Sequence, residues 1–428
     1  MSWFRLKDNN ATVTTEFLAG LTTFATVAYI IVVNPLILSQ AGMDFNAVMV
    51  ATILAASVST FMMGFYANYP FVQAPGMGLN AYFTYGVVIS MGHRWEEALG
   101  ASFIAGFLFL VLNLLGLRRL IMDAIPAGLR RAITGGIGLF LAFISVKNIG
   151  LIVENPNTLV ELGDITSPEV LLAGFGLVTI TVLMARNVKG AIILGILLSW
   201  TIGLALRLVE WKGIVAMPPS IAPTFLKLDI IAAFNPQMSD VLISFLFIAI
   251  FDTAGTLIGL AEQGGFLDAH GKLPRARKAL VTDAIGTMVG ALAGTSPMTT
   301  FLESSSGIEA GGRTGLTAVV AAALFLLSLF FGPLAASIPF FATAPVLIII
   351  GALMLKTLRN LRWNDPSEVI PAFVVMLMIP LTFSIATGIA VGFIIYPFTK
   401  LLCGRYKEIH WLGWILAILF IAKFAFMK

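Results

Sequence analysis

Long apolar runs recur along the whole chain, and short polar loops separate them. An apolar helix of about 20 residues crosses the hydrocarbon core of a bilayer, so each run predicts a membrane-spanning segment. About fourteen core segments are expected, over 15–39, 46–66, 76–92, 97–116, 127–149, 168–185, 189–208, 239–262, 279–294, 298–310, 314–333, 342–357, 367–384 and 386–402. The further apolar stretch 411–427 predicts either an extra span or a helix in the membrane interface. The pattern therefore predicts an all-α polytopic membrane protein.

Composition supports this class, because 58% of the 428 residues are hydrophobic and only 11% are charged, with a mean hydropathy of +0.96. Soluble domains carry about a quarter charged residues. The single cysteine, Cys403, excludes an intrachain disulfide, and His93, His270 and His410 fall in predicted loops or at a span edge. We therefore expect no catalytic centre, metal or bound cofactor. The net charge of +4 is small, so no nucleic-acid partner is expected.

Basic residues in the short loops indicate which segment ends face the cytoplasm. With the third and tenth segments counted as crossings, the basic clusters fall inside: Arg5 and Lys7; Arg118, Arg119, Arg130 and Arg131; Arg186 and Lys189; Lys272, Arg275, Arg277 and Lys278; Lys356, Arg359 and Arg362; Lys400, Arg405 and Lys407. The exceptions lie near the outer loop 209–238: Arg207, Lys212 and Lys227. Residues 1–17 lack the apolar core of a signal peptide. We therefore expect a cell-membrane protein with a cytoplasmic N-terminus.

The two halves of the chain carry similar segments in the same order. The stretch 109-FLVLNLLG-116 resembles 325-FLLSLFFG-332, and 71-FVQAPGMGLNAYF-83 lies opposite 293-AGTSPMTTFLESS-305. The offsets run from about 216 to 222, which is the constant spacing of an internal repeat. Each half has seven segments, an odd number, so the second half enters the membrane from the opposite side. This predicts an inverted-topology repeat, a plan that recurs among secondary transporters.

The third and tenth segments are interrupted by Pro75 and Pro297 at matching positions. Proline disfavours helix in the residue before it and is tolerated in the first turn of a helix. We expect a strand-like piece before each proline, and a half-helix that starts near it. Irregular backbone at membrane depth needs protein or a water-filled cavity around it, so the pair predicts a midplane site for a polar or planar group. The alternative is two kinked spans with small packing residues.

Two carboxylates fall well inside predicted spans, namely Asp252 and Glu303. A carboxylate at mid-bilayer costs roughly 2.5–3.5 kcal/mol on insertion scales, so such residues mark a substrate pathway or a proton relay. The alternatives are a structural role for Asp252 in binding backbone N–H groups, and a position for Glu303 at a segment end that reaches water. Four further polar residues are expected at interfaces or gates: Glu262, Gln263, Asp283 and Glu309.

Other candidates lie beside these carboxylates. Asn80 follows Gly76 by one helical turn and is expected to face the site, or else to bond another helix. Thr26, together with Thr22 and Thr23, gives the first segment a polar face next to Phe24 and Tyr29. A flat substrate would stack on such a ring, although aromatic residues in spans more often serve packing.

Four stretches in order along nearly the whole chain resemble the AzgA-like purine permeases of the nucleobase/ascorbate transporter group: 20-GLTTFATVAYIIVVNP-35, 74-APGMGLNAYF-83, 251-FDTAGTL-257 and 294-GTSPMTTFLESSSGI-308. The resemblance implies fourteen segments in two inverted repeats, arranged as a core domain and a gate domain. The implied core ranges are 1–126 and 239–341, the gate ranges are 127–238 and 342–402, and 403–428 forms a C-terminal apolar segment. A homodimer is also consistent with the resemblance.

The resemblance further implies proton-coupled uptake of adenine, guanine or hypoxanthine, driven by the proton gradient. The acidic substrate positions map onto Glu303 and Asp252, and we expect Glu303 to bind the base while Asp252 carries the coupled proton, or the reverse. The expected contacts also include Ala74, Gly76, Ser296, Met298, Thr299, Asn80, Thr26 and Phe24. Segment eight carries Asp where uracil and xanthine relatives carry Glu, so contact geometry does not transfer from those relatives.

The chemistry of the residues supports this expectation independently, since a carboxylate accepts from purine N–H groups and a carboxylic acid also donates. Three alternatives stay open. An anion transporter of the same fold would place its substrate at paired helix N-termini, but two acidic residues disfavour an anion. A polytopic membrane enzyme lacks a catalytic set in this sequence. A channel is disfavoured because interrupted midplane helices in inverted repeats are typical of alternating access.

Overall fold

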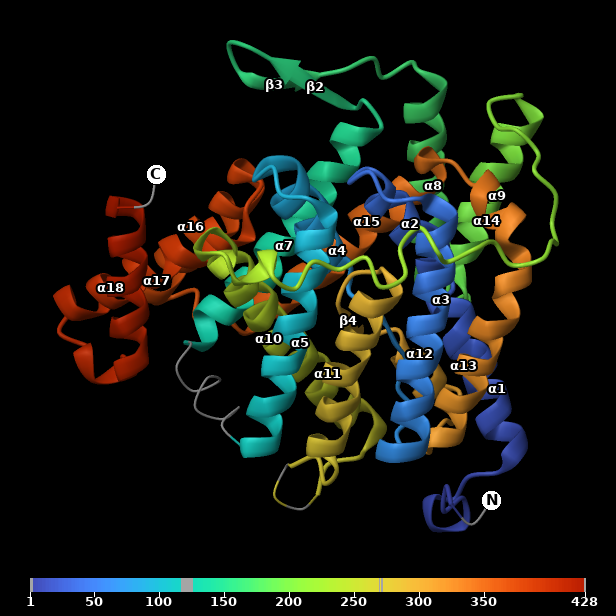
Figure 1. Cartoon of the computed structure of the whole chain (residues 1–428), viewed down its shortest axis with the longest axis horizontal. Helices are drawn as coiled ribbons and strands as arrows, with labels where there is room; N and C mark the ends of the chain where they lie inside the picture. Colours follow the sequence, from blue (N-terminus) through green and yellow to red (C-terminus); the bar gives the residue numbers. More distant parts are fainter. Residues whose placement is uncertain (1–2, 117–125, 269, 271, 427–428) are drawn as a thin grey trace. The chain divides into compact units, whose positions relative to one another are not determined.

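The computed structural model describes residues 3–116, 126–268, 270 and 272–426, and is built almost entirely from helices (Figure 1). Within the described residues, nine helices are long and apolar enough to cross a membrane, and three apolar helices are shorter. The predicted all-α polytopic class is therefore confirmed. The count of fourteen is not established by these lengths. Arg118 and Arg119 of one predicted basic loop lie outside the described residues, as does the last residue of the predicted stretch 411–427.

The chain divides into two compact units. Unit 1 comprises Met1–Leu114 and Asn148–Val346, and unit 2 comprises Leu115–Lys147 and Leu347–Lys428. The predicted gate segments between 168 and 238 thus fall in unit 1. Core and gate are defined by relative movement during transport, which compactness does not test, so that division stays a prediction.

Unit 1 contains most of the helices. They are α1 (Val13–Val27), α2 (Ile30–Ser39), α3 (Phe45–Met62), α4 (Met77–Ala81), α5 (Trp95–Leu115), α8 (Pro168–Ala185), α9 (Ala191–Ala205), α10 (Ser239–Gly264), α11 (Ala276–Ala293), α12 (Ser304–Glu309), α13 (Gly315–Ser328) and α14 (Gly332–Ser337). The first predicted span is divided into α1 and α2, because the backbone turns at Ala28–Tyr29. The boundary with unit 2 falls within α15 (Phe340–Met354).

Two stretches of unit 1 form wider π-helical turns, over Met63–Ala67 at the end of α3 and over Tyr82–Ser90 after α4. Two short antiparallel ladders complete the unit. One pairs β1 (Gln73–Pro75) with β4 (Met298–Thr300), and the other pairs β2 (Ile152–Asn155) with β3 (Leu159–Leu162). The second ladder is a hairpin in the loop between the predicted segments 127–149 and 168–185, which the sequence analysis did not predict.

A buried carboxylate joins α1 to α13. The Glu16 side chain is fully buried and accepts hydrogen bonds from the backbone N–H groups of Arg313 at 2.9 Å and Thr317 at 3.1 Å. The Thr317 hydroxyl donates to the same carboxylate at 2.6 Å. The first N–H groups of a helix have no partner within the helix, so Glu16 satisfies the start of α13 from a neighbouring helix.

Helix α13 also packs closely against the π-helical end of α3 through two glycines. A Cβ atom on Gly64 would lie 2.7 Å from the carbonyl oxygen of Gly315, and one on Gly315 would collide with the backbone of Gly64. Backbone cannot rotate away as a flexible side chain can. Only glycine therefore allows this approach.

Replacing Gly315 with Ala is expected to lower the free energy of unfolding by about 1–3 kcal/mol, because the added methyl group pushes the two backbones apart. Thermal unfolding of the purified protein measures the change. The matched control is Gly174→Ala in α8, where a Cβ atom meets nothing within 4 Å. The control should be neutral or slightly stabilising, since Ala favours helix over Gly. Equal losses in both variants would contradict the close approach.

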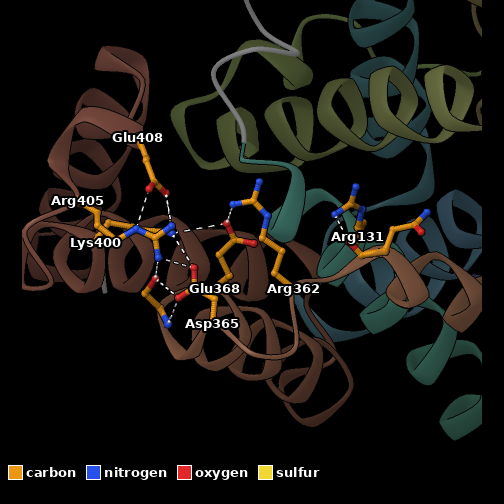
Figure 2. Close-up of polar contacts among 9 residues, drawn as sticks. Arg131, Arg362, Asp365, Glu368, Lys400, Arg405 and Glu408 are labelled. Carbon is orange, nitrogen blue, oxygen red and sulfur yellow. Dashed lines mark hydrogen bonds and ion pairs between the residues drawn. The ribbon is translucent and has the colours of Figure 1, made fainter.

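Unit 2 contains α7 (Ala127–Asn148), whose last residue falls in unit 1, together with α16 (Pro366–Thr382), α17 (Ile385–Leu402) and α18 (Trp411–Phe426). An ion-pair network joins the start of α16 to the end of α17 (Figure 2). The fully buried Lys400 ammonium lies 2.9 Å from Glu408, 3.5 Å from Asp365 and 3.6 Å from Glu368. Arg405 bonds Asp365 at 2.5 Å and Glu408 at 2.7 Å. Lys400 was counted among the basic residues that follow the last core segment, and the structure corrects this by placing it, buried, within α17.

Candidate functional site

The two proline-bearing segments meet as paired strands. Gln73 lies opposite Thr300, Ala74 opposite Thr299, and Pro75 opposite Met298. Backbone bonds extend the ladder at both ends, from Gly76 N to Pro297 O at 3.0 Å and from Phe301 N to Val72 O at 3.0 Å. Both strands are fully buried. The ladder thus satisfies irregular backbone that would otherwise be costly inside a membrane.

The predicted start of the first half-helix is close to the observed one, since α4 begins at Met77 after Gly76. The second half-helix is present as α12, but its predicted start near Pro297 is wrong. The extended backbone continues through Thr300, and α12 begins only at Ser304. Pairing with β1 supplies hydrogen bonds to residues 298–300, and their two threonines favour extended backbone. The two helices therefore start beyond opposite ends of the ladder, near Pro297 for α4 and near Val72 for α12, where the Ser304 hydroxyl accepts from Val72 N at 3.0 Å.

Glu303 lies at the turn between β4 and α12 and keeps part of its surface accessible. Its carboxylate accepts a hydrogen bond from the Tyr29 hydroxyl at 2.7 Å. Thr26 reaches the same turn, with its hydroxyl 2.9 Å from that of Ser306 and 3.4 Å from the carbonyl oxygen of Glu303. The carboxylate makes no capping bond to α12. It is therefore held in place from the turn between α1 and α2, and its accessible surface leaves it open to a further donor.

Asp252 lies at the middle of α10 and is half-buried. Its carboxylate lies near the Thr299 side chain of β4 and interacts electrostatically with Glu303. Helix α10 packs against both β4 and α12. The structure thus brings the two predicted carboxylates to one place, although they belong to different elements and lie far apart in the sequence.

Asn80 and Ser296 are both fully buried, and the Ser296 hydroxyl donates to the amide oxygen of Asn80. The Ser296 hydroxyl also lies 3.4 Å from the amide oxygen of Asn34 in α2. The Asn34 amide nitrogen in turn donates to Thr295 at 2.8 Å and to Thr52 at 2.7 Å. The Asn80 oxygen therefore already has a partner across the ladder. This favours a structural role for Asn80, although its partner Ser296 lies in the segment between α11 and β4 and not on another helix.

The remaining predicted contacts divide by accessibility. Thr26 and Phe24 stay half-buried, like the two carboxylates, and the Phe24 ring packs edge-on against Phe325 at 5.2 Å. Four others have buried side chains or none: Ala74, Gly76, Met298 and Thr299. A Cβ atom on Gly76 would lie 2.8 Å from the Thr299 hydroxyl, so this glycine allows the ladder to close. These four residues form or flank the buried strand ladder. The side chains with accessible surface are those of Glu303, Asp252, Thr26 and Phe24.

Asp283 was expected at an interface or gate, and the structure corrects this. Its side chain is fully buried and accepts hydrogen bonds from Gln73 at 2.9 Å, from Thr300 at 3.3 Å and from the Thr253 hydroxyl. Helix α11 begins at Ala276, three residues before the predicted start, which moves Asp283 two turns into the helix. Asp283 is therefore a fully buried carboxylate close to Asp252, because it bonds Thr253, the next residue in the chain after Asp252.

The other three residues of that group are exposed. Glu262, Gln263 and Glu309 lie at helix ends, and the Gln263 amide donates to Glu309 at 2.7 Å. The sequence analysis did not identify Ser306 and Gln73 as site residues. Both are ordinary polar residues in sequence. Ser306 follows Glu303 by three residues, whereas only the pairing of distant segments places Gln73 beside Asp283.

A carboxylate accessible to a ligand can accept N–H donors, and the neighbouring hydroxyls of Thr26 and Ser306 can both donate and accept. The half-buried Phe24 ring adds an apolar surface. The arrangement therefore suits a small, planar, uncharged molecule with several N–H groups on its edge.

Comparison with known proteins identifies relatives over the full length. The model of a family described as "Permease family" matches residues 14–391. The guanine/hypoxanthine permease PbuO of Bacillus subtilis strain 168 is 45% identical, with 98% of this chain and 99% of the relative aligned. The adenine permease AdeP of Escherichia coli strain K12 is 43% identical, with 99% of this chain and 95% of the relative aligned.

A solved structure shows the same fold. The transmembrane domain of the cyanobacterial bicarbonate transporter BicA matches with a TM-score of 0.67 and covers 89% of this chain and 97% of its own. The sequence identity is 16%, so this likeness concerns the fold alone.

Proposed function

Because this chain belongs to the permease family, we propose that it carries purine nucleobases, namely adenine, guanine or hypoxanthine, across the cell membrane. The observation that carries the proposal is the full-length identity of 43% to an adenine permease and 45% to a guanine/hypoxanthine permease. The accessible carboxylate of Glu303 supports it, because purines present N–H donors on their edges.

Within this function we propose that Glu303 binds the base and that Asp252 carries a coupled proton. Tyr29 holds the Glu303 carboxylate at 2.7 Å, which orients it before substrate arrives. Asp252 contacts Thr299 and interacts with Glu303, so its protonation state responds to what Glu303 binds. A proton on Asp252 would remove one of two neighbouring negative charges, which supports joint uptake of proton and base.

We further propose that transport proceeds by alternating access, with substrate binding near β1 and β4. Interrupted segments at related positions of two inverted repeats are the usual site of secondary transporters. The bicarbonate transporter of similar fold does not favour an anionic substrate here, because two carboxylates beside the site repel anions.

Uptake of radiolabelled hypoxanthine and adenine into cells lacking their own purine permeases tests the function. Saturable uptake that unlabelled adenine, guanine or hypoxanthine compete with, and that uracil and bicarbonate do not, is the expected result. A protonophore should abolish accumulation above the external concentration. No purine uptake by protein verified in the membrane would contradict the function, while uptake insensitive to the protonophore would contradict only the proton coupling.

A further inference from the structure

A pocket of about 600 Å³ lies in unit 1 away from the strand ladder. It is bounded by the N-terminal arm (residues 3–9), the π-helical end of α3 and the segment before α11. Its lining includes Arg5, Arg275 and Lys278 together with the rings of Trp3 and Tyr66. We infer that this pocket binds the phosphate of an anionic phospholipid headgroup.

The wall formed by the N-terminal arm is fixed to the helix end. The indole N–H of Trp3 donates to the carbonyl oxygen of Phe65 at 2.9 Å, and the Asn68 amide donates to that of Phe4 at 3.4 Å. The rings of Phe4 and Phe65 lie 5.7 Å apart. These contacts hold Trp3 and Arg5 beside the end of a predicted span. The N-terminal arm therefore forms a fixed wall of the pocket, opposite residues of the π-helical end of α3 and of the start of α11.

Two of the three cations in the pocket lie against aromatic rings. The Arg275 guanidinium lies 4.3 Å from the centre of the Tyr69 ring, and the Lys278 ammonium lies 5.1 Å from that of Tyr66. Within the described residues, Arg5, Arg275 and Lys278 form no ion pair, and Asp8 is the one acidic residue of the lining. A cation–π contact orients a cation without neutralising it. The pocket therefore keeps a positive excess that a phosphate would satisfy.

The aromatic rim favours a lipid over a soluble phosphate compound. Trp3, Phe65 and Tyr66 are 68%, 47% and 48% exposed, and they surround the end of the apolar span Phe45–Ala67. Exposed Trp and Tyr beside Lys and Arg at a span end are typical of the headgroup level of a membrane. Basic residues on the expected cytoplasmic side also attract anionic lipids. Acyl chains would lie along the exposed rings while the phosphate enters the pocket.

The test is lipid binding by the purified full-length protein in neutral detergent, measured by native mass spectrometry with phosphatidylglycerol and phosphatidylcholine. The pocket variant is Arg5→Gln with Lys278→Gln. The matched control is Lys7→Gln with Lys272→Gln, which removes the same charge from exposed positions outside the lining. Glycerol 3-phosphate, which has the headgroup chemistry without acyl chains, tests for a soluble ligand. Thermal unfolding checks that all variants are folded.

We expect the parent protein to prefer phosphatidylglycerol, and the pocket variant to bind it about 10- to 30-fold more weakly, from two lost lysine or arginine contacts at a membrane surface. The control should bind like the parent. Equal losses in both variants would show general electrostatic attraction, and binding of glycerol 3-phosphate as tight as that of the lipid would show a soluble-ligand site. Either result overturns the inference.

Should the pocket variant fail to fold, fluorescence quenching by brominated phosphatidylglycerol tests the inference instead. We expect more quenching in the parent than in Trp3→Phe, and equal quenching in the two proteins would overturn the inference. Purine transport is not needed for these measurements, so they stand apart from the proposed function.

Discussion

Replacing Glu303 with Gln is expected to reduce purine uptake by about 10- to 100-fold without reducing the amount of protein in the membrane. A hydrogen bond to a charged group contributes about 1.5–3 kcal/mol, and each 1.4 kcal/mol changes an equilibrium constant tenfold. The amide keeps the size of the side chain but replaces one acceptor oxygen by an N–H donor, which would face the N–H groups of the base. Initial rates of adenine and hypoxanthine uptake measure the loss.

The matched control for this substitution is Glu309→Gln at the end of α12, the helix that follows Glu303. Glu309 is exposed and bonds only the Gln263 amide among the described contacts, so uptake should stay within about twofold of the parent, as for surface substitutions generally. Parent-like binding and uptake in Glu303→Gln would show that the site assignment is wrong.

Asp252→Asn separates the two proposed roles. With Asp252 as the proton carrier, this variant should still bind purines and exchange them across the membrane, but should not accumulate them against a gradient. Binding to purified protein and accumulation in vesicles with an imposed pH gradient measure the two properties. If Asp252→Asn loses binding while Glu303→Gln loses only accumulation, the roles are exchanged.

The candidate site could be predicted from sequence at positions where a residue type is energetically costly inside a membrane span. Asp252 and Glu303 stood out because a carboxylate in an apolar span needs a reason. Pro75 and Pro297 marked the two interrupted segments, and the structure pairs them one residue apart in register, with Pro75 opposite Met298. Proline restricts backbone locally, so its effect is readable without knowledge of the fold.

The remaining features depend on contacts between distant parts of the chain. The second helix starts at Ser304 because residues 298–300 pair with a strand about 225 residues earlier, as Ala74 and Thr299 lie opposite each other. Asp283 is buried because Gln73 and Thr253 reach it from two other elements. Glu16 reads as an ordinary first-turn acid in sequence, yet it satisfies the start of α13. Local propensity contains no information about such partners.

Replacing Lys400 with Met is expected to destabilise unit 2 by about 3 kcal/mol, because three partly buried carboxylates lose the ammonium group that they share. Lys400 is fully buried, whereas its partners Asp365, Glu368 and Glu408 keep 18%, 12% and 39% of their side-chain surface exposed. This solvent contact puts the expected loss at the lower end of the range for buried pairs. Thermal unfolding measures it, and Lys407→Met at the exposed neighbouring position is the control. A loss no larger than that of the control would show that the network does not stabilise the fold.

The same network gives the loss a defined pH dependence. Hydrogen bonds from Ser367 and Arg405 hold the pKa of Asp365 below its usual value, and those from Lys400 and Arg405 do the same for the pKa of Glu408. A carboxyl whose pKa is lowered by folding contributes stability above its ordinary pKa of about 4, and loses that contribution as the pH falls through the lowered value. The parent protein should therefore lose stability below about pH 4 as these carboxylates become protonated.

The Lys400→Met variant should lose less stability over this pH range, because its carboxylates lack the ammonium group that stabilised their charge. The difference in melting temperature between the two proteins should accordingly narrow as the pH falls, and a difference that stays constant from pH 7 down to acid would mean that Lys400 acts through packing alone.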